Sequence, residues 1–433
     1  MPMSTSLEIS DATPYTESAG HLRRMTSLGG RVSRVMANWR VPPRAKAVLR
    51  ADRRADRADP GPQVFTRACM EWLVRAQDHS ITQDGGVARH FSLLSGWSAS
   101  YPETTGYIVP TVLDYAARTG DPVLRERGRR MLDWLTAIQF PEGGIQGGTI
   151  DFQPRVPVTF NTGQVLLGFA AGVREFGDCY REPMCRAAHW LRDSQDADGC
   201  WRTHPTPFAV PGEKTYETHV AWGLFEAARL APGEGYGEAG LRQVSWALAK
   251  QRPNGWFADC CLTDSHAPLT HTLGYALRGI LEAHLYAPAQ CPLDAAIALA
   301  DALLARQEPD GRLSGRYDAS WRPHVRWACP TGIAQIAICW LRLFELSGVP
   351  KYRDAACKAN RYVRRRVRLD GDPDICGGVP GSFPVDGGYG PFQYLSWAAK
   401  FCIDANLLEM DLDKLAASRI ATRPSAQSAG VPA

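Results

Sequence analysis

The sequence predicts an all-α fold, an (α/α)6 toroid in which six helical hairpins close into one ring. Two interleaved repeats indicate this fold: one marks the end of an outer helix, and the other marks the start of an inner helix. The length of 433 residues exceeds that of a usual single domain. Repeats that must stack on one another nevertheless favour one closed body over several domains.

The first repeat is a helix that ends in an apolar pair, three further residues and Gln, followed by a turn with Gly. Its apolar residues at three- and four-residue spacing face a partner helix, and Gly supplies the left-handed conformation after the helix. The Gln side chain can hydrogen-bond the backbone of this turn. The copies end at Gln77, Gln139, Gln195, Gln251 and Gln307, and a degenerate sixth ends near Arg366 with Asp370-Gly371.

The second repeat places Thr at the start of an apolar helix, as in residues 331–344. Helices that are apolar nearly all round are buried, so these helices form the inner set. Because they start at equivalent places in the repeat, their first residues should gather around one mouth of the ring. The copies are residues 102–107, 160–164, 216–219, 270–273 and 330–332, and residues 390–394 are expected to open the sixth inner helix.

The repeats divide the chain into a toroid at residues 61–412 and two flanking segments. Residues 1–60 are rich in Arg, Ser and Pro and predict a mostly disordered basic leader, and residues 413–433 predict a flexible tail. The net charge is +4, and the leader contributes 11 minus 6, or +5, so the rest of the chain sums to −1. A nucleic-acid partner is therefore not expected, because phosphate binding needs a basic surface on the fold itself.

The twelve cysteines are irregularly spaced and several lie within helical patterns, which favours buried, reduced thiols over disulfides. No apolar run reaches the ~18 residues that a membrane-spanning helix needs, and the N-terminus lacks a signal-type apolar stretch. These observations predict a cytoplasmic protein without a transmembrane segment.

The run Leu-x3-Gln-x3-Gly-x-Trp at residues 191–201 resembles the repeat motif of terpenoid cyclase and protein prenyltransferase toroids. Through the other copies the resemblance extends loosely over residues 64–410. It implies the fold rather than an activity, because α/α toroids carry many chemistries. Proton-initiated cyclases use an Asp-x-Asp-Asp motif, which this sequence lacks; the nearest run, residues 370–374, contains Pro.

Prenyltransferase toroids hold zinc with Asp, Cys and His, which draws attention to Cys260, Cys261, His266 and His271. Thiolates and imidazoles at this density can bind zinc. Their spacing matches no standard metal loop, however, and a metal-free turn before an inner helix explains the segment equally well. We therefore expect neither a metal nor a cofactor.

Flat rings and hydrogen-bonding groups combine at the starts of the predicted inner helices, which is typical of a sugar site. Aromatic rings can stack on pyranose faces, while acids, amides and imidazoles bind hydroxyls or move protons. The aromatic candidates are Trp97, Tyr101, Tyr107, Tyr216, Tyr275, Tyr394 and Trp397, and the polar ones are Glu103, Asn161, Gln164, Glu217, His219 and His271. Basic residues that flank these segments and would suit an anionic sugar are Arg89, His90, Arg278 and Arg326.

Two chemistries fit these residues, and the sequence leaves both open. Glu103 and Glu217 suit glycoside hydrolysis as an acid/base pair. The combination of Tyr, His and Asn instead suits proton abstraction beside a uronate carboxylate, as in polysaccharide lyases and epimerases. Structural roles compete with both, because a Glu at a helix start also caps the helix and His219 or His271 could be a core histidine.

The runs at residues 97–107 and 269–279 resemble uncharacterised proteins of bacterial exopolysaccharide clusters, which implies a glycan context. We therefore predict an enzyme of hydrolase or lyase type that acts on a polysaccharide or glycan precursor in the central cavity. Its catalytic candidates are Glu103, Glu217, His271 and His219. The alternatives are an isoprenoid-processing enzyme, which needs a dry aromatic lining, and a non-catalytic glycan-binding toroid.

Overall fold

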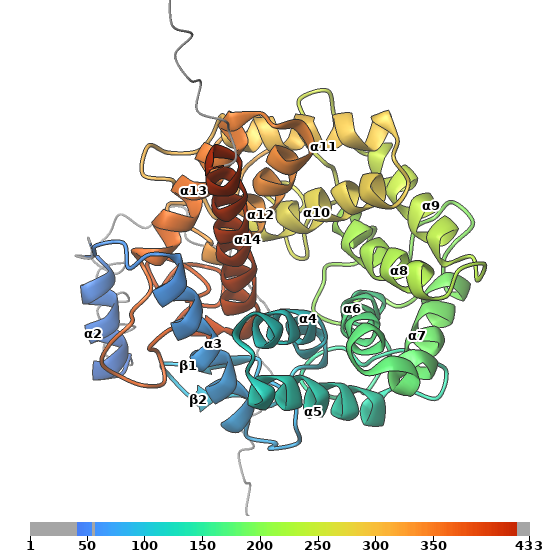
Figure 1. Ribbon diagram of the computed structural model, residues 1–433, viewed down its shortest axis with the longest axis horizontal. Helices are drawn as coiled ribbons and strands as arrows, with labels where there is room; N and C mark the ends of the chain where they lie inside the picture. Colours follow the sequence, from blue (N-terminus) through green and yellow to red (C-terminus); the bar gives the residue numbers. More distant parts are fainter. Residues whose placement is uncertain (1–40, 54–56, 422–433) are drawn as a thin grey trace, which may run out of the picture.

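The computed structural model describes residues 41–53 and 57–421, and within them six outer and six inner helices alternate along the chain. Figure 1 shows both sets around a common centre. The outer helices are α3 (Pro62–Asp78), α5 (Pro122–Ile138), α7 (Arg181–Asp193), α9 (Tyr236–Leu248), α11 (Gln290–Leu304) and α13 (Pro350–Arg364). The inner helices are α4 (Pro102–Thr119), α6 (Thr159–Phe176), α8 (Thr218–Leu230), α10 (Thr270–Tyr286), α12 (Pro330–Ser347) and α14 (Ser396–Ala421). The predicted (α/α)6 toroid is confirmed.

Each inner helix packs against the next one around the ring, and α14 returns to contact both α3 and α4. Close approach of the inner helices depends on glycine at some of the contacts. A Cβ atom on Gly168 of α6 would lie 2.5 Å from the carbonyl oxygen of Gly106 in α4. Glycine at both positions therefore lets these two backbones meet and narrows the ring.

A small antiparallel sheet joins the first and last hairpins. Its strands β1 (His90–Ser92), β2 (Gly96–Trp97) and β3 (Gln393–Leu395) lie in the order β2-β1-β3. Phe91 pairs with Trp97 on one side and with Tyr394 on the other. Residues 390–394 were expected to open the last inner helix, and this prediction is wrong. Residues 393–395 form strand β3 and pair with β1, so the helix begins only at Ser396.

The Gln at the end of each of the first five outer helices links two neighbouring hairpins. Gln195 donates from Nε2 to the carbonyl oxygen of Gly199 in its own turn and to that of Ala239 in the next outer helix, each at 2.9 Å. Arg242 donates to its Oε1 at 2.9 Å. The predicted bond to the turn is confirmed, and Gln139, Gln251 and Gln307 repeat the double bond.

The degenerate sixth copy differs from its prediction. Gly371 has a positive φ of 82°, but no atom lies close to the Cβ position there. The glycine that packs against the next outer helix is Gly377, where a Cβ would lie 2.1 Å from the carbonyl oxygen of Ala68 in α3. Gly377 thus closes the ring, and Arg75 donates to the carbonyl oxygen of the neighbouring Cys376.

The disorder predicted for residues 1–60 is wrong for part of that segment, because Pro43–Asp52 forms helix α2. Ala45 and Val48 are buried, and Arg44 pairs with Asp372 and Asp374 in the loop after α13. This docking depends on a loop that is remote in sequence, so local periodicity did not indicate it. The remainder of the leader that precedes residue 41 lies outside the described residues.

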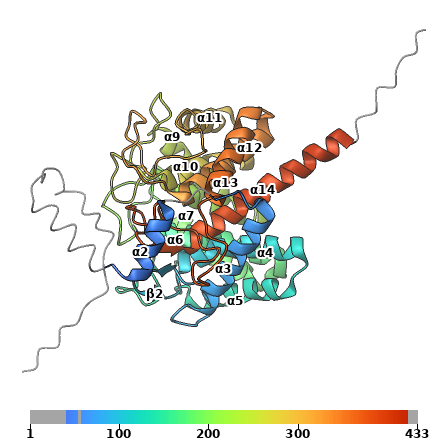
Figure 2. The same cartoon turned by 90° about the vertical axis from the view of Figure 1, so that its left-hand side faces the viewer.

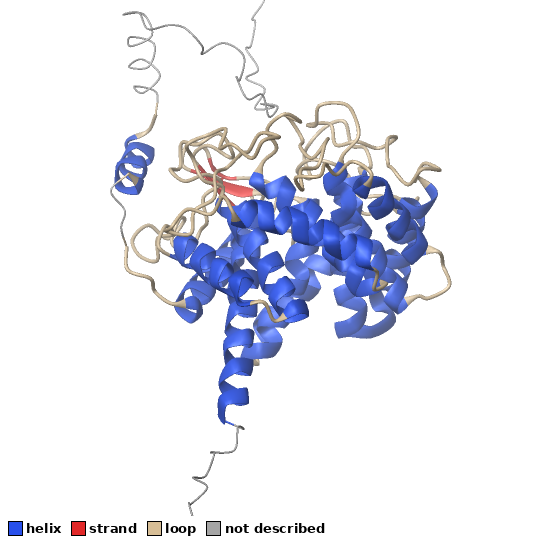
Figure 3. Cartoon of the chain, turned by 90° about the horizontal axis from the view of Figure 1, so that it is seen from above, coloured by secondary structure: helices blue, strands red, loops and turns tan. Residues whose placement is uncertain are grey.

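Long loops lead from each outer helix to the next inner helix, and these loops gather at one end of the ring (Figure 3). At the other end α14 extends beyond its neighbours (Figure 2). It continues to Ala421, so residues 413–421 are helical rather than part of a flexible tail, and residues 422–433 lie outside the described part. All twelve cysteines fall within the described ranges and are free thiols. None of the described helices has the length and apolar character needed to cross a bilayer.

Candidate functional site

A cavity lies at the end of the ring where the inner helices begin. Its volume is about 650 Å³, a value that includes space open to solvent. Its side chains come from the first turns of α4, α6 and α10, from the start of α14, and from the loops above them. The lining residues are Arg89, Tyr101, Glu103, Phe160, Asn161, Thr206, Phe208, Tyr216, Leu262, Thr263, His271, Thr272, Tyr275, Tyr389 and Trp397.

Glu103 lies in the first turn of α4 and is the acidic residue of this cavity. Its Oε2 atom accepts a hydrogen bond of 2.6 Å from the hydroxyl of Tyr101. Burial raises the pKa of Glu103 to about 7, although Tyr101 and the positive charge of Arg89 oppose the shift. Near neutral pH the carboxyl group can therefore give up or hold a proton.

His271 lies in the first turn of α10, and its Nδ1 atom is 2.7 Å from Oε1 of Gln335 on α12. Burial lowers the pKa of His271 to about 4, so the ring is neutral at pH 7. Because the amide oxygen accepts the proton on Nδ1, the lone pair of the neutral ring lies on Nε2. His271 therefore combines a fixed tautomer with a place in the cavity wall.

Aromatic rings form much of the remaining wall. The ring of Tyr275 lies 4.4 Å from the ring of His271 and 5.1 Å from that of Phe160, measured between centroids. Trp397 donates from Nε1 to the hydroxyl of Tyr389 at 2.9 Å, which fixes both side chains. The Arg89 guanidinium lies over the Trp397 ring at 5.3 Å. The site thus offers flat apolar faces next to one cation.

Of the predicted binding residues, Tyr101, Asn161, Tyr216 and Tyr275 line this cavity. Asn161 donates from Nδ2 to the carbonyl oxygen of Gln146, which holds its amide in place. Predicted residues Tyr107, Gln164 and His219 are fully buried and do not line it. Nδ1 of His219 lies 2.7 Å from Oε1 of Gln164, and the Tyr275 hydroxyl lies 3.4 Å from that of Tyr107. These residues pack against Tyr275 or one another outside the cavity lining.

Trp97 and Tyr394 were predicted to bind substrate, and the structure places them elsewhere. Trp97 packs on Trp72 at 5.4 Å between ring centroids and donates to Asp374 Oδ1 at 3.2 Å. Tyr394 lies in strand β3. Both residues help to close the ring, because the small sheet carries them to the seam between the first and last hairpins.

Of the basic residues that flank these segments, Arg89 alone lines the cavity. The Nη1 atom of Arg89 lies 2.9 Å from Nδ1 of His90. Burial lowers the pKa of His90 to about 3. Arg278 pairs with Glu282 inside the helical layer, and Arg326 is exposed. An anionic group in the cavity would therefore meet Arg89.

Glu217, the second carboxyl group predicted to act with Glu103, opens into a neighbouring pocket instead of the central cavity. The two residues are not equivalent in the repeat: Glu103 precedes the repeated Thr105 by two positions, and Glu217 precedes Thr218 by one. A short 3-10 turn, η2 (Thr215–Glu217), leads into α8. Tyr216 lines the central cavity and the other pocket, whereas Glu217 lines the other pocket alone.

The segment considered for zinc forms a turn. Cys260 donates from Sγ to the carbonyl oxygen of Thr272, Arg316 donates to Cys261, and His266 is exposed. Among the described residues, no three His, Cys, Asp or Glu side chains are grouped closely enough to hold a metal ion.

Several lining residues were not predicted from the sequence, and they come from the loops. Thr206 and Phe208 follow α7, Leu262 and Thr263 follow α9, and Tyr389 follows α13. The loops differ in length and lack the repeat. No periodic signal could have placed them, because only the folded ring brings their tips over the same mouth.

Comparisons with known proteins agree with this architecture. A family model described as the squalene-hopene cyclase C-terminal domain matches residues 97–281. No curated protein matches this chain in sequence. Similar solved structures include an unsaturated glucuronyl hydrolase specific for heparin, with a TM-score of 0.67, 14% identity and coverage of 82% of this chain and 99% of that one.

An unsaturated glucuronyl hydrolase from Bacillus sp. GL1 gives a TM-score of 0.64 at 16% identity, covering 80% of this chain and 96% of its own. The cellobiose 2-epimerase from Bacillus thermoamylovorans gives 0.60 at 10% identity, with coverage of 80% and 97%. At these identities the likeness concerns the fold. The chain is thus an (α/α)6 toroid that shares a cyclase-like segment with squalene-hopene cyclases and its overall architecture with six-hairpin glycosidases.

Proposed function

We propose that this protein is a carbohydrate-active enzyme that cleaves a uronate-containing glycan by elimination in its central cavity. The observation that carries the proposal is that Glu103 and His271, whose pKa values shift in opposite directions, line the same cavity as Arg89. Pairs of titratable groups with separated pKa values are typical of acid/base sites. The similar structures are also named for their action on sugars.

In this proposal His271 is the general base and Glu103 the general acid. Nε2 of His271 takes the proton from the ring carbon beside the uronate carboxylate. The electron pair of that bond forms a carbon–carbon double bond, and the bond from the sugar to the glycosidic oxygen breaks. Glu103 gives its proton to this oxygen as it leaves, and Arg89 offsets the charge that develops on the carboxylate.

Elimination fits these residues better than hydrolysis by two carboxylates. In hydrolysis both carboxyl groups must flank one glycosidic bond. Glu103 lines the central cavity, whereas Glu217 lines the neighbouring pocket. The rings of Tyr216, Tyr389 and Trp397 would hold the sugar by its apolar faces.

The test is incubation with uronate oligosaccharides, measuring both ultraviolet absorbance of the new double bond and the number of reducing ends. We expect double bonds to form, and Glu103→Gln and His271→Ala to lower kcat by about 100-fold or more. The matched exposed variants Glu238→Gln and His324→Ala should retain full activity. New reducing ends without double bonds would mean hydrolysis, and binding without either product would mean a glycan-binding protein.

Isoprenoid cyclisation is a second candidate, favoured by the family model over residues 97–281 and by the aromatic wall. Aromatic faces stabilise cations, and a protonated Glu103 could start such a reaction. The sequence lacks the Asp-x-Asp-Asp motif of proton-initiated cyclases. Incubation with squalene and with isoprenoid diphosphates, followed by mass spectrometry, tests it: a cyclic product that Glu103→Gln abolishes would replace the glycan proposal.

A further inference from the structure

A second pocket lies beside the central cavity and shares part of its wall. It encloses about 620 Å³, open solvent included, and Thr206 and Tyr216 line both spaces. Tyr216 and Glu217 are consecutive residues. Tyr216 lines both spaces, whereas Glu217 lines only the second pocket. The start of α8 therefore lies between two adjacent spaces.

Glu217 is a buried acid without a hydrogen-bond partner at one of its oxygens. Its side chain is 5% exposed, and no described residue bonds Oε2. Leaving a buried polar atom unsatisfied costs free energy. Of the described buried side-chain atoms without a partner, Glu217 Oε2 is the one whose residue lines either pocket. A ligand in the pocket would supply the missing partner.

Lys214 lies on the same wall and is 8% exposed. Its ammonium group donates to the carbonyl oxygen of Val210 at 2.8 Å. That is the one hydrogen bond recorded for this group among the described residues, and an ammonium has three donors. Two donors are thus available in the pocket that Glu217 also lines.

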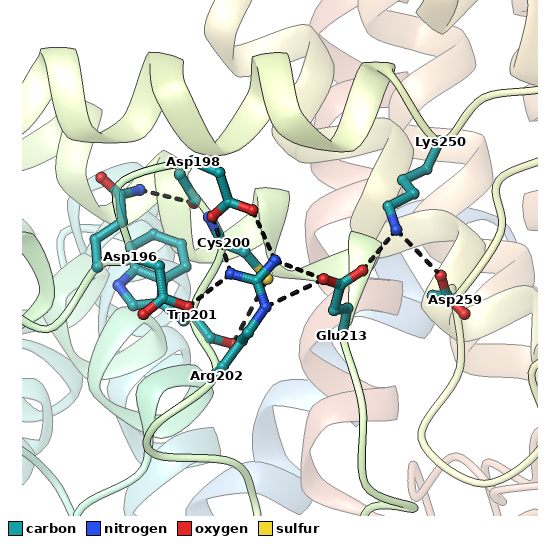
Figure 4. Close-up of polar contacts among 10 residues, drawn as sticks. Asp196, Asp198, Cys200, Trp201, Arg202, Glu213, Lys250 and Asp259 are labelled. Carbon is teal, nitrogen blue, oxygen red and sulfur yellow. Dashed lines mark hydrogen bonds and ion pairs between the residues drawn. The ribbon is translucent and has the colours of Figure 1, made fainter.

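Arg202 also lines the pocket, but its guanidinium is already fully used. All five of its donor positions are occupied by Asp196, Asp198 and Glu213. Figure 4 shows Arg202 between these carboxylates, with Glu213 reaching on to Lys250. This network fixes the loop between α7 and α8 and leaves Lys214 and Glu217 as the charged side chains of the pocket that keep unused hydrogen-bonding capacity.

A flat ring completes the pocket. Trp201 donates from Nε1 to the carbonyl oxygen of Leu191 at 2.8 Å, and its side chain is 4% exposed. Its ring is therefore held in a fixed position in a wall that Pro205 and Tyr216 also line. A rigid aromatic surface beside a few polar groups is the usual composition of a site for a sugar ring.

We propose that this second pocket binds a second sugar unit through its hydroxyl groups, so that the substrate spans both pockets and is at least a disaccharide. Hydroxyl groups both donate and accept, so neighbouring ones can bind the Lys214 ammonium and the Glu217 carboxyl group together. Trp201 offers the ring an apolar face. This inference rests on the proposed function of the central cavity, where the reacting uronate unit would lie.

Fluorine NMR of protein labelled with fluorotryptophan tests the inference, because Trp397 lines only the central cavity and Trp201 only the second pocket. The two resonances are assigned with Trp201→Phe and Trp397→Phe. The probes are glucuronic acid and cellobiouronic acid, a disaccharide of glucuronate and glucose. We expect the monosaccharide to shift Trp397 alone and the disaccharide to shift both resonances.

Variants of the pocket give the second readout. Lys214→Met and Glu217→Met should weaken binding of the disaccharide by about 10- to 100-fold and leave binding of glucuronic acid unchanged. Lys351→Met and Glu238→Met, both on the surface, are the matched controls and should bind both sugars normally.

The outcomes separate the two proposals. A disaccharide that shifts Trp397 but not Trp201, or that binds the two pocket variants as tightly as the wild type, overturns the second subsite and leaves the proposed function intact. If the disaccharide shifts the Trp201 resonance alone, the proposed function is wrong. The inference that the substrate spans both pockets then fails with it. If neither resonance responds to either sugar, both proposals are wrong.

Discussion

The hydroxyl of Tyr101 donates a hydrogen bond of 2.6 Å to Oε2 of Glu103, and both residues line the central cavity. This bond stabilises the carboxylate form and opposes burial, which favours the protonated form. The resulting pKa of about 7 makes Glu103 suited to proton transfer near neutral pH. Tyr101 is therefore a positioning residue whose effect can be measured through Glu103.

Tyr101→Phe should raise the pKa of Glu103, because the variant loses a hydrogen bond to the charged form. The alkaline limb of the kcat/KM profile should move up by about one pH unit. Tyr115→Phe, in α4 but outside the cavity, is the matched control and should leave the limb in place. An unchanged limb in Tyr101→Phe would show that Glu103 is not the acid.

The pH dependence of kcat/KM should be bell-shaped. Activity requires neutral His271, with a pKa of about 4, and protonated Glu103, with a pKa of about 7. Activity should therefore rise as pH increases through about 4 and fall as pH increases through about 7. Glu103→Gln should abolish the alkaline limb in its residual activity. A profile that rises through pH 7 would assign Glu103 as a base.

Glu217→Met should make the protein more stable while it weakens the second pocket. The substitution removes a buried oxygen without a hydrogen-bond partner, whose burial costs about 1–3 kcal/mol of folding free energy. It also replaces the side chain with an apolar one of similar size. Urea unfolding measures the change, with the exposed Glu238→Met expected to stay within about 0.5 kcal/mol of wild type. A large loss of stability would mean that Glu217 has a structural role.

The free energy of unfolding should also depend on Glu217 as pH changes. Burial raises the pKa of its folded state to about 8, above the ordinary value of 4.5. The protonated form favours folding, so its contribution is complete below pH 4.5 and is lost as pH rises toward 8. Comparing Glu217→Gln with wild type across this range checks the sign: the wild type should lose more stability than the variant.

The turn glycines should tolerate no side chain where they contact the next outer helix. Gly311 has a φ of 96°, and a Cβ there would lie 2.1 Å from the carbonyl oxygen of Lys358. Gly311→Ala should lower the free energy of unfolding by more than the roughly 1–3 kcal/mol that backbone strain alone costs. Gly348→Ala is the control, since Gly348 has a φ of 68° but open space around its Cβ position. Equal losses in both would mean that the contact contributes nothing.

Much of the candidate site follows from the repeats, and the remainder does not. The repeats place Glu103, Asn161, Tyr216 and His271 at the starts of inner helices, and all four line the central cavity, Tyr216 from the 3-10 turn before α8 and the others from first helical turns. The repeats cannot predict which of the two pockets a residue lines. A difference of one residue relative to the repeated Thr, together with the 3-10 turn before α8, directs Glu217 away from Glu103.

The toroid follows from local patterns, because apolar periodicity, Gln at helix ends and Gly in the turns are local requirements that recur from one hairpin to the next. The tertiary structure decided which side chains meet. Closure of the ring carries Trp97 and Tyr394 to the seam, buries His219 beneath Tyr275, and docks α2 on a loop more than three hundred residues away. It also brings loops without any repeat over one cavity, since contacts between distant segments depend on the closed ring and leave no local pattern.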